Sequence, residues 1–198
     1  MRVAVSGSHS TGKSTLIAAF VGRRPEYVYE PEAFEALADD VELTSGEGPT
    51  PDGLQALLKY TAAALALHAP GACVVYERSP VDYLAYAAAS HGTWSAEDRE
   101  AFLTTHVPVV RASVRHLDLM ALLPVSGTGP VGPRPGEDAR FRRRVDESLR
   151  RALVDDDYDL FGDPASPSVV ELSPLPERQL SELLRLTSIE PGYSSSSR

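Results

Sequence analysis

The sequence contains no asparagine, one cysteine and two lysines, and each scarcity excludes a class of protein or feature. Without asparagine the chain cannot carry the N-K-x-D motif with which Ras-type GTPases recognise guanine. The single cysteine, Cys73, cannot form an internal disulfide, which predicts a protein of the reducing cytoplasm. No apolar run approaches the roughly 20 residues of a membrane span, so we expect no membrane association.

The charge balance is acidic, with 19 Lys and Arg against 28 Asp and Glu and a formal net charge of −9. Nucleic-acid binding needs a basic surface, so we expect no nucleic acid as a partner. The length of 198 residues and the 42% of hydrophobic residues suit one globular domain. We expect that domain to cover residues 1–190, followed by a disordered Ser-rich tail over residues 191–198.

Short apolar runs alternate with stretches of helical periodicity along the chain. This alternation predicts an α/β domain with a mainly parallel sheet. Ser95 and Asp98 resemble a capping box that begins a helix, and Pro108 is expected to kink or split that helix. The expected strands are Val3–Val5, Tyr27–Tyr29, Ala72–Tyr76, Leu117–Leu123 and Val169–Leu172.

Residues 7–14, Gly-Ser-His-Ser-Thr-Gly-Lys-Ser, fit the phosphate-binding pattern G-x-x-x-x-G-K-[ST] without a mismatch. An apolar strand precedes them and an amphipathic helix follows, as such a P-loop requires. Lys13 is expected to reach the β- and γ-phosphates, and the hydroxyl of Ser14 to bind Mg²⁺. The predicted nucleotide-binding residues are Gly7, His9, Ser10, Thr11, Gly12, Lys13, Ser14 and Thr15.

The strand at Cys73–Tyr76 helps to choose among P-loop proteins. An AAA-type motor would show an apolar strand ending in Asp-Glu, whereas this strand continues into Glu77, Arg78 and Ser79. The sequence therefore favours a small-molecule kinase, which transfers the γ-phosphoryl group to a bound acceptor.

Residues 76–79, Tyr-Glu-Arg-Ser, resemble the E/D-R-S motif of deoxynucleoside kinases, and Glu30-Pro31 resembles their E-P motif. The run from Glu77 to Tyr86 is also similar to the bacterial AAA-type ATP-binding domains allied to ribosylnicotinamide kinase. The resemblance implies a P-loop NTPase three-layer α/β/α sandwich with a five-stranded parallel sheet in the order 2-3-1-4-5. It also implies ATP as phosphoryl donor, with Mg²⁺.

Two carboxylates, Glu30 and Glu77, are expected beside the P-loop, because ligands gather at the carboxyl ends of parallel strands. By analogy with the resembled kinases, Glu30 is the candidate base and Glu77 holds the metal, and the reverse assignment stays open. Arg78 would lie between these carboxylates and the transferring phosphoryl group. Asp82 either contacts the acceptor or only favours the dipole of its helix.

Residues 140–151 carry six arginines against two acids in an otherwise acidic chain. In the resembled kinases this position is a lid, here about residues 126–151, whose arginines close over the phosphates. Helical spacing favours Arg140 and Arg144, then Arg143, and directs Arg142 elsewhere. The alternative is a solvated helix whose arginines pair with neighbouring acids.

These features together predict an ATP- and Mg²⁺-dependent phosphotransferase acting on a hydroxyl of a small molecule, with a nucleoside or nucleoside-like acceptor favoured. One alternative is a nucleotide-binding regulatory or switch protein without a small acceptor. Another is an antibiotic or sugar kinase. The oligomeric state is left open, with a dimer among the alternatives.

Overall fold

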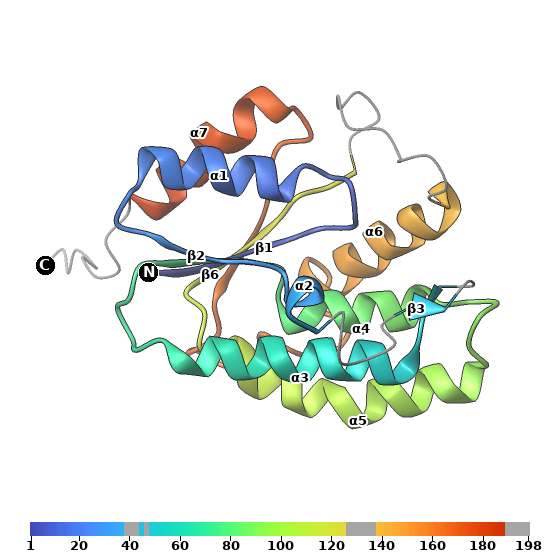
Figure 1. Ribbon diagram of the computed structural model, residues 1–198. Helices are drawn as coiled ribbons and strands as arrows, with labels where there is room; N and C mark the ends of the chain where they lie inside the picture. Colours follow the sequence, from blue (N-terminus) through green and yellow to red (C-terminus); the bar gives the residue numbers. More distant parts are fainter. Residues whose placement is uncertain (38–43, 46–47, 126–137, 189–198) are drawn as a thin grey trace, which may run out of the picture.

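The computed structural model describes residues 1–37, 44–45, 48–125 and 138–188 (Figure 1). The expected Ser-rich tail and the Gly- and Pro-rich stretch of residues 126–136 lie outside these residues. The strands are β1 (Arg2–Ser6), β2 (Val28–Glu30), β3 (Thr44–Ser45), β4 (Gly48–Pro49), β5 (Val74–Glu77), β6 (Leu119–Leu122) and β7 (Ser168–Glu171). The helices are α1 (Lys13–Arg23), α2 (Ala33–Leu37), α3 (Pro51–Leu67), α4 (Pro80–Ala89), α5 (Ala96–Val114), α6 (Ala139–Leu153) and α7 (Pro176–Thr187).

Five strands form one parallel sheet in the order β2-β5-β1-β6-β7. Numbered among themselves along the chain, these strands have the order 2-3-1-4-5, so the predicted topology is confirmed. The register pairs Val5 of the central strand β1 with Glu77 of β5. The P-loop after β1 and the charged residues after β5 therefore leave the sheet at the same level.

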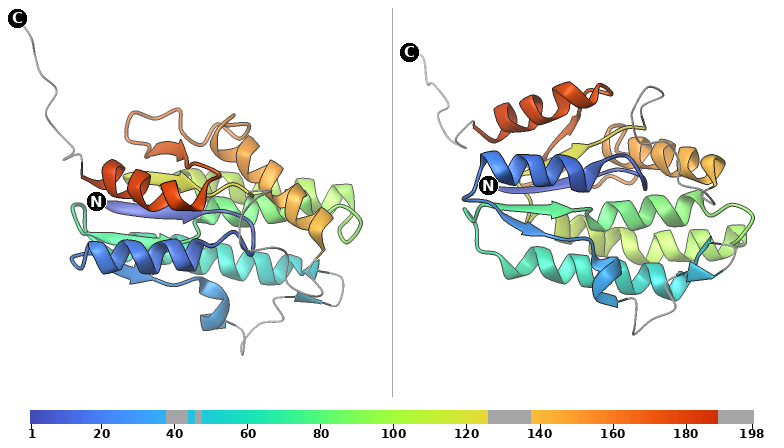
Figure 2. Two further views of the ribbon diagram at one scale, coloured as in Figure 1. Left: turned by 90° about the horizontal axis from the view of Figure 1, so that it is seen from above. Right: turned by 45° about the horizontal axis from the view of Figure 1, so that its top comes forward.

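The sheet is covered on both faces, as Figures 1 and 2 show. Val3 and Val5 belong to a buried cluster with residues of α1 and α7, whereas Ala4 faces a second cluster that includes residues of α3, α4, α5 and α6. This alternation follows from the period of two along a strand. The expected three-layer α/β/α sandwich is confirmed.

The arginine-rich helix is present as α6, and it packs against α4. Val145, Leu149 and Ala152 are fully buried on the face that joins it to the rest of the protein. The buried face of α6 is thus part of the hydrophobic core, whereas the first residues of the helix, Ala139 and Arg140, are exposed. Closure of a lid over bound nucleotide stays a prediction.

Pro108 was expected to kink or split its helix, and the split is wrong. Pro108 lies inside α5, which runs without interruption over 19 residues from a capping box formed by Ser95 and Asp98. Proline removes one hydrogen bond to the carbonyl four residues earlier, at Thr104. Both Pro108 and Thr104 lie on the exposed face of α5, where solvent is available to that carbonyl.

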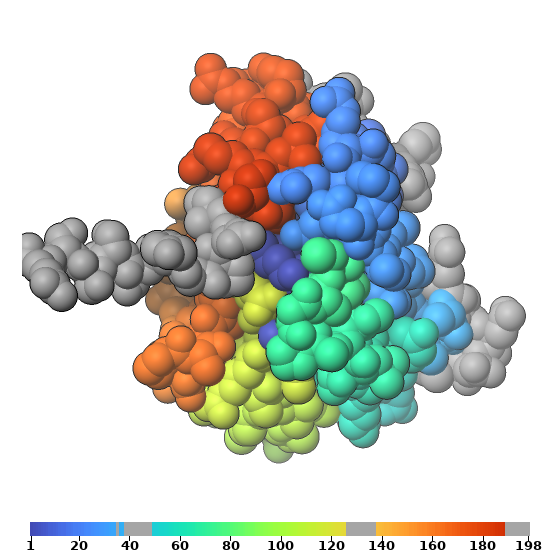
Figure 3. Space-filling model, turned by 90° about the vertical axis from the view of Figure 1, so that its left-hand side faces the viewer, coloured from blue at the N-terminus to red at the C-terminus, as the bar shows by residue number. Residues whose placement is uncertain are grey.

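The two ends of the sheet differ in character. Figure 3 shows the end at which the strands begin, where the start of the chain is largely covered by its neighbours. There Arg2 is buried and its guanidinium lies 3.2 Å from a carboxylate oxygen of Asp118. The residues predicted to bind nucleotide lie at the opposite end. None of the helices in the described part of the chain is both long and apolar enough to cross a bilayer.

Candidate active site

The P-loop joins β1 to α1 and has the backbone of a phosphate cradle. A Cβ atom on Gly7 would lie 2.8 Å from the carbonyl oxygen of Leu123, so only glycine fits there. Ser10 and Gly12 both adopt left-handed backbone conformations, with φ of 55° and 95°. Alternating handedness of this kind turns successive N–H groups toward one centre, which suits the oxygens of a phosphate. Gly12 is also the N-cap of α1, whose N-terminal end favours an anion.

Lys13 begins α1 and points into the loop. Its side chain is buried, and its ammonium group donates a hydrogen bond to the carbonyl oxygen of Ser8 at 2.9 Å. Burial, with the charge of Arg78 as the next cause, lowers the pKa of Lys13 to about 7. The carboxylates of Glu32, Asp82 and Glu77 offset this effect only in part, so a negatively charged ligand in the P-loop would favour the ammonium form.

Glu77 ends β5 beside the P-loop and accepts two hydrogen bonds. The hydroxyl of Ser14 donates to Oε1 at 2.8 Å, and that of Tyr29 donates to Oε2 at 2.5 Å. A hydroxyl and a carboxylate held together supply the hard oxygen ligands that Mg²⁺ prefers. The pair therefore fits the predicted metal site next to the phosphates.

Through its side chain, Arg78 links the P-loop to the segment that follows β2. Its backbone has a φ of 74°, a conformation that a non-glycine residue rarely adopts, and its side chain is buried. The guanidinium donates to the carbonyl oxygen of Gly7 at 2.8 Å and to Glu32 at 2.5 Å, and it lies over the ring of Tyr86. Local strain of this kind is maintained only by surrounding contacts, and it gathers at functional sites.

Asp82 is fully buried behind Arg78 and completes the capping box of α4 with Ser79. Its carboxylate accepts hydrogen bonds from the Ser6 hydroxyl at 2.7 Å, the Gly7 amide at 3.1 Å and the Ser79 amide at 2.9 Å. The Arg78 guanidinium approaches it at 3.3 Å. These contacts tie the start of the P-loop to α4, and they favour a positioning role over acceptor contact.

Replacing Asp82 with asparagine is expected to lower the free energy of unfolding by about 3–5 kcal/mol, because it leaves buried donors and Arg78 without their anion. Asp98 offers a matched control, since it has the same place in the exposed capping box of α5. Asp98→Asn should cost only about 1 kcal/mol. Urea denaturation measures both. Similar losses for the two variants would contradict the role given to Asp82.

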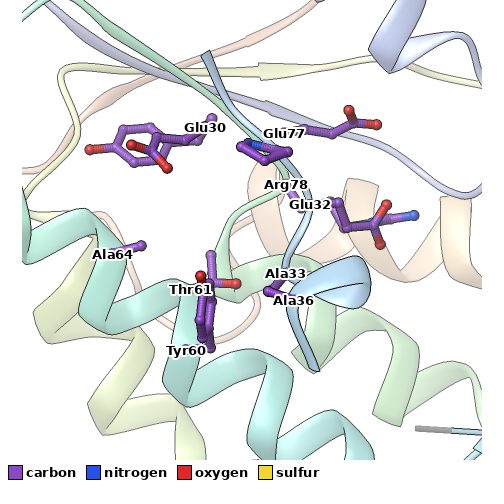
Figure 4. A pocket seen from close by; sticks show the side chains of 11 residues that line it. Glu30, Glu32, Ala33, Ala36, Tyr60, Thr61, Ala64, Glu77 and Arg78 are labelled. Carbon is purple, nitrogen blue, oxygen red and sulfur yellow. The ribbon is translucent and has the colours of Figure 1, made fainter. Parts of the chain in front are cut away.

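Glu30 and Glu32 flank Pro31 at the end of β2, and their side chains diverge. A carboxylate oxygen of Glu30 lies 2.9 Å from Nε2 of His68, the residue that caps the far end of α3. Figure 4 shows Glu30 pointing to one side and Glu32 and Glu77 to the other. The structure thus turns the predicted base, Glu30, away from the P-loop and places Glu32 on Arg78 instead.

A pocket with a cavity volume of about 90 Å³ opens between α2, α3 and the ends of β2 and β5. Arg78 and Glu32 border it on the side of the P-loop, and small side chains leave it room (Figure 4). A space of this size holds several water molecules or part of a small ligand. Its lining residues are Glu30, Pro31, Glu32, Ala33, Ala36, Tyr60, Thr61, Ala64, Tyr76, Glu77 and Arg78.

The arginines of α6 are arranged differently from the prediction. Arg142, which helical spacing directed elsewhere, is buried against the P-loop, where it donates to the carbonyl oxygens of His9 at 3.1 Å and Ser10 at 2.8 Å. Arg144 donates to the carbonyl oxygen of Ala89 at 3.0 Å, and Arg140 and Arg143 are exposed. The expectation for Arg142 was wrong because the docking angle of a helix decides which of its faces meets the loop.

Three other residues predicted to bind nucleotide lie in the P-loop or in the first turn of α1. The imidazole of His9 stacks on Phe141 and lies 3.4 Å from the hydroxyl of Tyr86. The hydroxyl of Thr11 donates to the carbonyl oxygen of Ser8 at 3.0 Å. Thr15 lies on the exposed first turn of α1. The residues predicted to bind nucleotide therefore lie together in one loop and the start of α1, whereas Glu30 lies apart from them.

Known structures share this fold. Deoxyadenosine kinase from M. mycoides, with dCMP and dCDP bound, matches with a TM-score of 0.67 and 14% identity, over 96% of this chain and 100% of that chain. The same kinase with bound dATP matches with a TM-score of 0.61 and 13% identity, over the same shares of both chains. These TM-scores show a common fold, that of a P-loop NTPase.

The NadR protein in complex with NR matches with a TM-score of 0.65 and 21% identity, over 98% of this chain and 53% of that chain. The chain thus spans about half the length of NadR. No curated protein sequence matches it significantly. A family model described as an AAA domain covers residues 2–169, most of the sheet and its helices. The chain therefore belongs to this family of P-loop AAA domains, as the resemblance at residues 77–86 predicted.

Proposed function

We propose that the protein is an ATP- and Mg²⁺-dependent phosphotransferase that phosphorylates a hydroxyl of a small molecule, with a nucleoside or nucleoside-like compound as acceptor. The observation that carries this proposal is the pocket beside the P-loop, bordered by Glu32 and Arg78. A nucleotide-binding switch needs a phosphate loop and a metal-side carboxylate, but it has no use for a second pocket with its own carboxylate. The likeness to deoxyadenosine kinase and NadR supports the same class of reaction.

The donor side of the site consists of the P-loop, Lys13 and the pair of Ser14 and Glu77. Loop amides and Lys13 would bind the β- and γ-phosphates, and Ser14 with Glu77 would hold the metal. When bound, Mg²⁺ neutralises charge that develops on the phosphate oxygens. This proposal is supported by the positions of these groups in the P-loop, in the first turn of α1 and at the end of β5.

The acceptor side is assigned to Glu32 in place of Glu30. Glu32 would accept the proton of the acceptor hydroxyl as the hydroxyl oxygen bonds to the γ-phosphorus and the bond to the leaving ADP oxygen breaks. Arg78 holds Glu32 through one nitrogen and the P-loop carbonyl of Gly7 through another, so it sets the two sides at a fixed separation. Phosphate contact by Arg140 and Arg144 stays a prediction.

The direct test is acceptor-dependent release of ADP from ATP and Mg²⁺, measured with nucleosides, sugars and aminoglycoside antibiotics in parallel. A nucleoside that stimulates release well above the background, and that is recovered as its monophosphate, supports the proposal. Release that no acceptor stimulates would instead support a regulatory nucleotide-binding protein. Stimulation by a sugar or antibiotic alone would retain the reaction and replace the acceptor class.

Thermal unfolding narrows the choice of acceptor before the assay. A ligand present at about 100 times its dissociation constant stabilises the folded state by about 2.7 kcal/mol, which shifts Tm visibly. The screen should include a non-hydrolysable ATP analogue with Mg²⁺, so that the P-loop is filled. An acceptor is expected to raise Tm further in its presence.

The role of Glu77 predicts a change in metal requirement. Glu77→Gln is expected to raise the Mg²⁺ concentration for half-maximal activity by about tenfold or more, because an amide oxygen binds Mg²⁺ less strongly than a carboxylate oxygen. Tyr29→Phe is the matched control, since it removes one hydrogen bond to Glu77 but keeps the charge. The metal titration of Tyr29→Phe should shift less. An unchanged titration for Glu77→Gln would remove Glu77 from the metal site.

A further inference from the structure

One guanidinium, that of Arg142, supports the P-loop from outside. Its Nε donates to the carbonyl oxygen of His9 at 3.1 Å, and its Nη2 donates to that of Ser10 at 2.8 Å. These are consecutive residues in the variable part of the loop, ahead of Gly12 and Lys13. The planar guanidinium of arginine can donate two hydrogen bonds in a fixed geometry to two neighbouring acceptors. The single ammonium group of a lysine does not hold two acceptors in a fixed geometry.

The two carbonyl groups determine where two loop amides point. A trans peptide unit is planar, and its C=O and N–H point in opposite directions. The described residues contain no cis peptide bond. Fixing the carbonyls of His9 and Ser10 toward Arg142 therefore directs the N–H groups of Ser10 and Thr11 away from it. That is the orientation in which loop amides cradle a phosphate.

Arg142 is itself held in place by its helix. Val145 and Leu149, which follow it on α6, are fully buried, and Phe141 stacks on the ring of His9. The hydroxyl of Tyr86 on α4 approaches the same imidazole at 3.4 Å. Arg142 thus holds the loop by hydrogen bonds to its backbone. Phe141 and Tyr86 contact the side chain of His9.

We propose that Arg142 is a positioning residue that holds the P-loop amides in their phosphate-binding orientation through the carbonyl oxygens of His9 and Ser10. It acts on the polyphosphate of the nucleotide without touching it. The inference rests on the proposed binding of ATP, but it is independent of the acceptor and of phosphoryl transfer.

The test compares binding of AMP-PNP with Mg²⁺ by the wild-type chain and by Arg142→Met. The substitution is expected to raise the dissociation constant about tenfold, because disordered loop amides lose part of their contact with phosphate. AMP, which has no β-phosphate, should bind with little change. This split between AMP-PNP and AMP is the signature of a positioned loop, since general loss of structure weakens both.

Two further variants sharpen the comparison. Arg150→Met removes one positive charge from the same helix at an exposed ion pair with Glu171, so it controls for charge alone. Its dissociation constants should stay within about twofold of the wild type. Arg142→Lys keeps the charge and, with a single donor group, should recover only part of the affinity. If Arg142→Met does not fold, Arg142→Lys takes its place in the comparison with the wild type.

The outcomes separate the two proposals. Equal affinity of wild type, Arg142→Met and Arg142→Lys for AMP-PNP overturns the positioning role and leaves the proposed function intact. Parallel losses for AMP and AMP-PNP, with a lower Tm, also overturn it, because Arg142 is then only structural. A wild-type chain that binds no AMP-PNP, ADP or tripolyphosphate refutes the proposed function, and with it the role of Arg142.

Discussion

Replacing Lys13 with methionine is expected to lower kcat/KM for phosphoryl transfer by about 10²–10³-fold, the loss that follows removal of one preorganised group that stabilises developing charge. The folded structure should survive. Methionine has a long unbranched side chain that can follow the path of the lysine stem, and the polar contact that it loses is the hydrogen bond from the ammonium to the carbonyl oxygen of Ser8. Loss of activity with an unchanged Tm would locate the effect in the site.

The physical reason is the free-energy cost of burying the positive charge of Lys13. Burial and Arg78 together lower the pKa of Lys13 to about 7, so the surrounding protein disfavours the ammonium form. Oxygen atoms of the β- and γ-phosphates would favour the ammonium form of Lys13 again. During transfer, negative charge increases on the phosphate oxygen that leaves with ADP. Lys13 is therefore expected to lower the free energy of the transition state relative to that of the free enzyme and its substrates.

Lys59 provides an internal control, because it is the other lysine of the chain and lies exposed on α3. Lys59→Met removes the same charge at a distance from the P-loop and should leave kcat/KM nearly unchanged. The acceptor-dependent ADP assay measures both variants. If a folded Lys13→Met protein turned over at the wild-type rate, the P-loop would not be the donor site.

The sheet was predictable because buried parallel strands are nearly continuous apolar runs. The expected strand at residues 3–5 lies within β1, and the one at residues 117–123 encloses β6. Their order came from the resemblance to known kinases, since local pattern carries no information on which strands are neighbours. The two-residue strands β3 and β4 were not predicted, because so short a segment shows no periodicity.

The site was predictable where chemistry depends on consecutive residues, as in the P-loop and in Glu77 and Arg78. It was not predictable where the direction of a long side chain depends on partners that are distant in the sequence. In an extended strand a spacing of two would place Glu30 and Glu32 on the same side, but β2 ends at Glu30. In the structure Glu30 faces His68, whereas Glu32 faces Arg78. The spacing of two acids around a proline was the one signal that could have pointed to Glu32.

Glu32 and Glu30 are therefore expected to differ sharply when each is changed to glutamine. Glu32→Gln should lower kcat by about 10²-fold or more, the contribution typical of a general base, and should leave the affinity for AMP-PNP unchanged. Glutamine keeps the size of the side chain and can still accept a hydrogen bond from Arg78, but it cannot take up a proton from the acceptor hydroxyl. A loss confined to kcat is the mark of an interaction made in the transition state.

Glu30→Gln is the matched control, because it changes the same residue type two positions earlier on a side chain that faces His68. It should alter kcat far less, and any effect should be on the KM of the acceptor, since Glu30 lines the pocket away from the P-loop. Steady-state kinetics with saturating ATP and Mg²⁺ gives both constants for both variants. A large loss of kcat in Glu30→Gln, with little change in Glu32→Gln, would return the role of base to Glu30 and require its side chain to leave His68 when the acceptor binds.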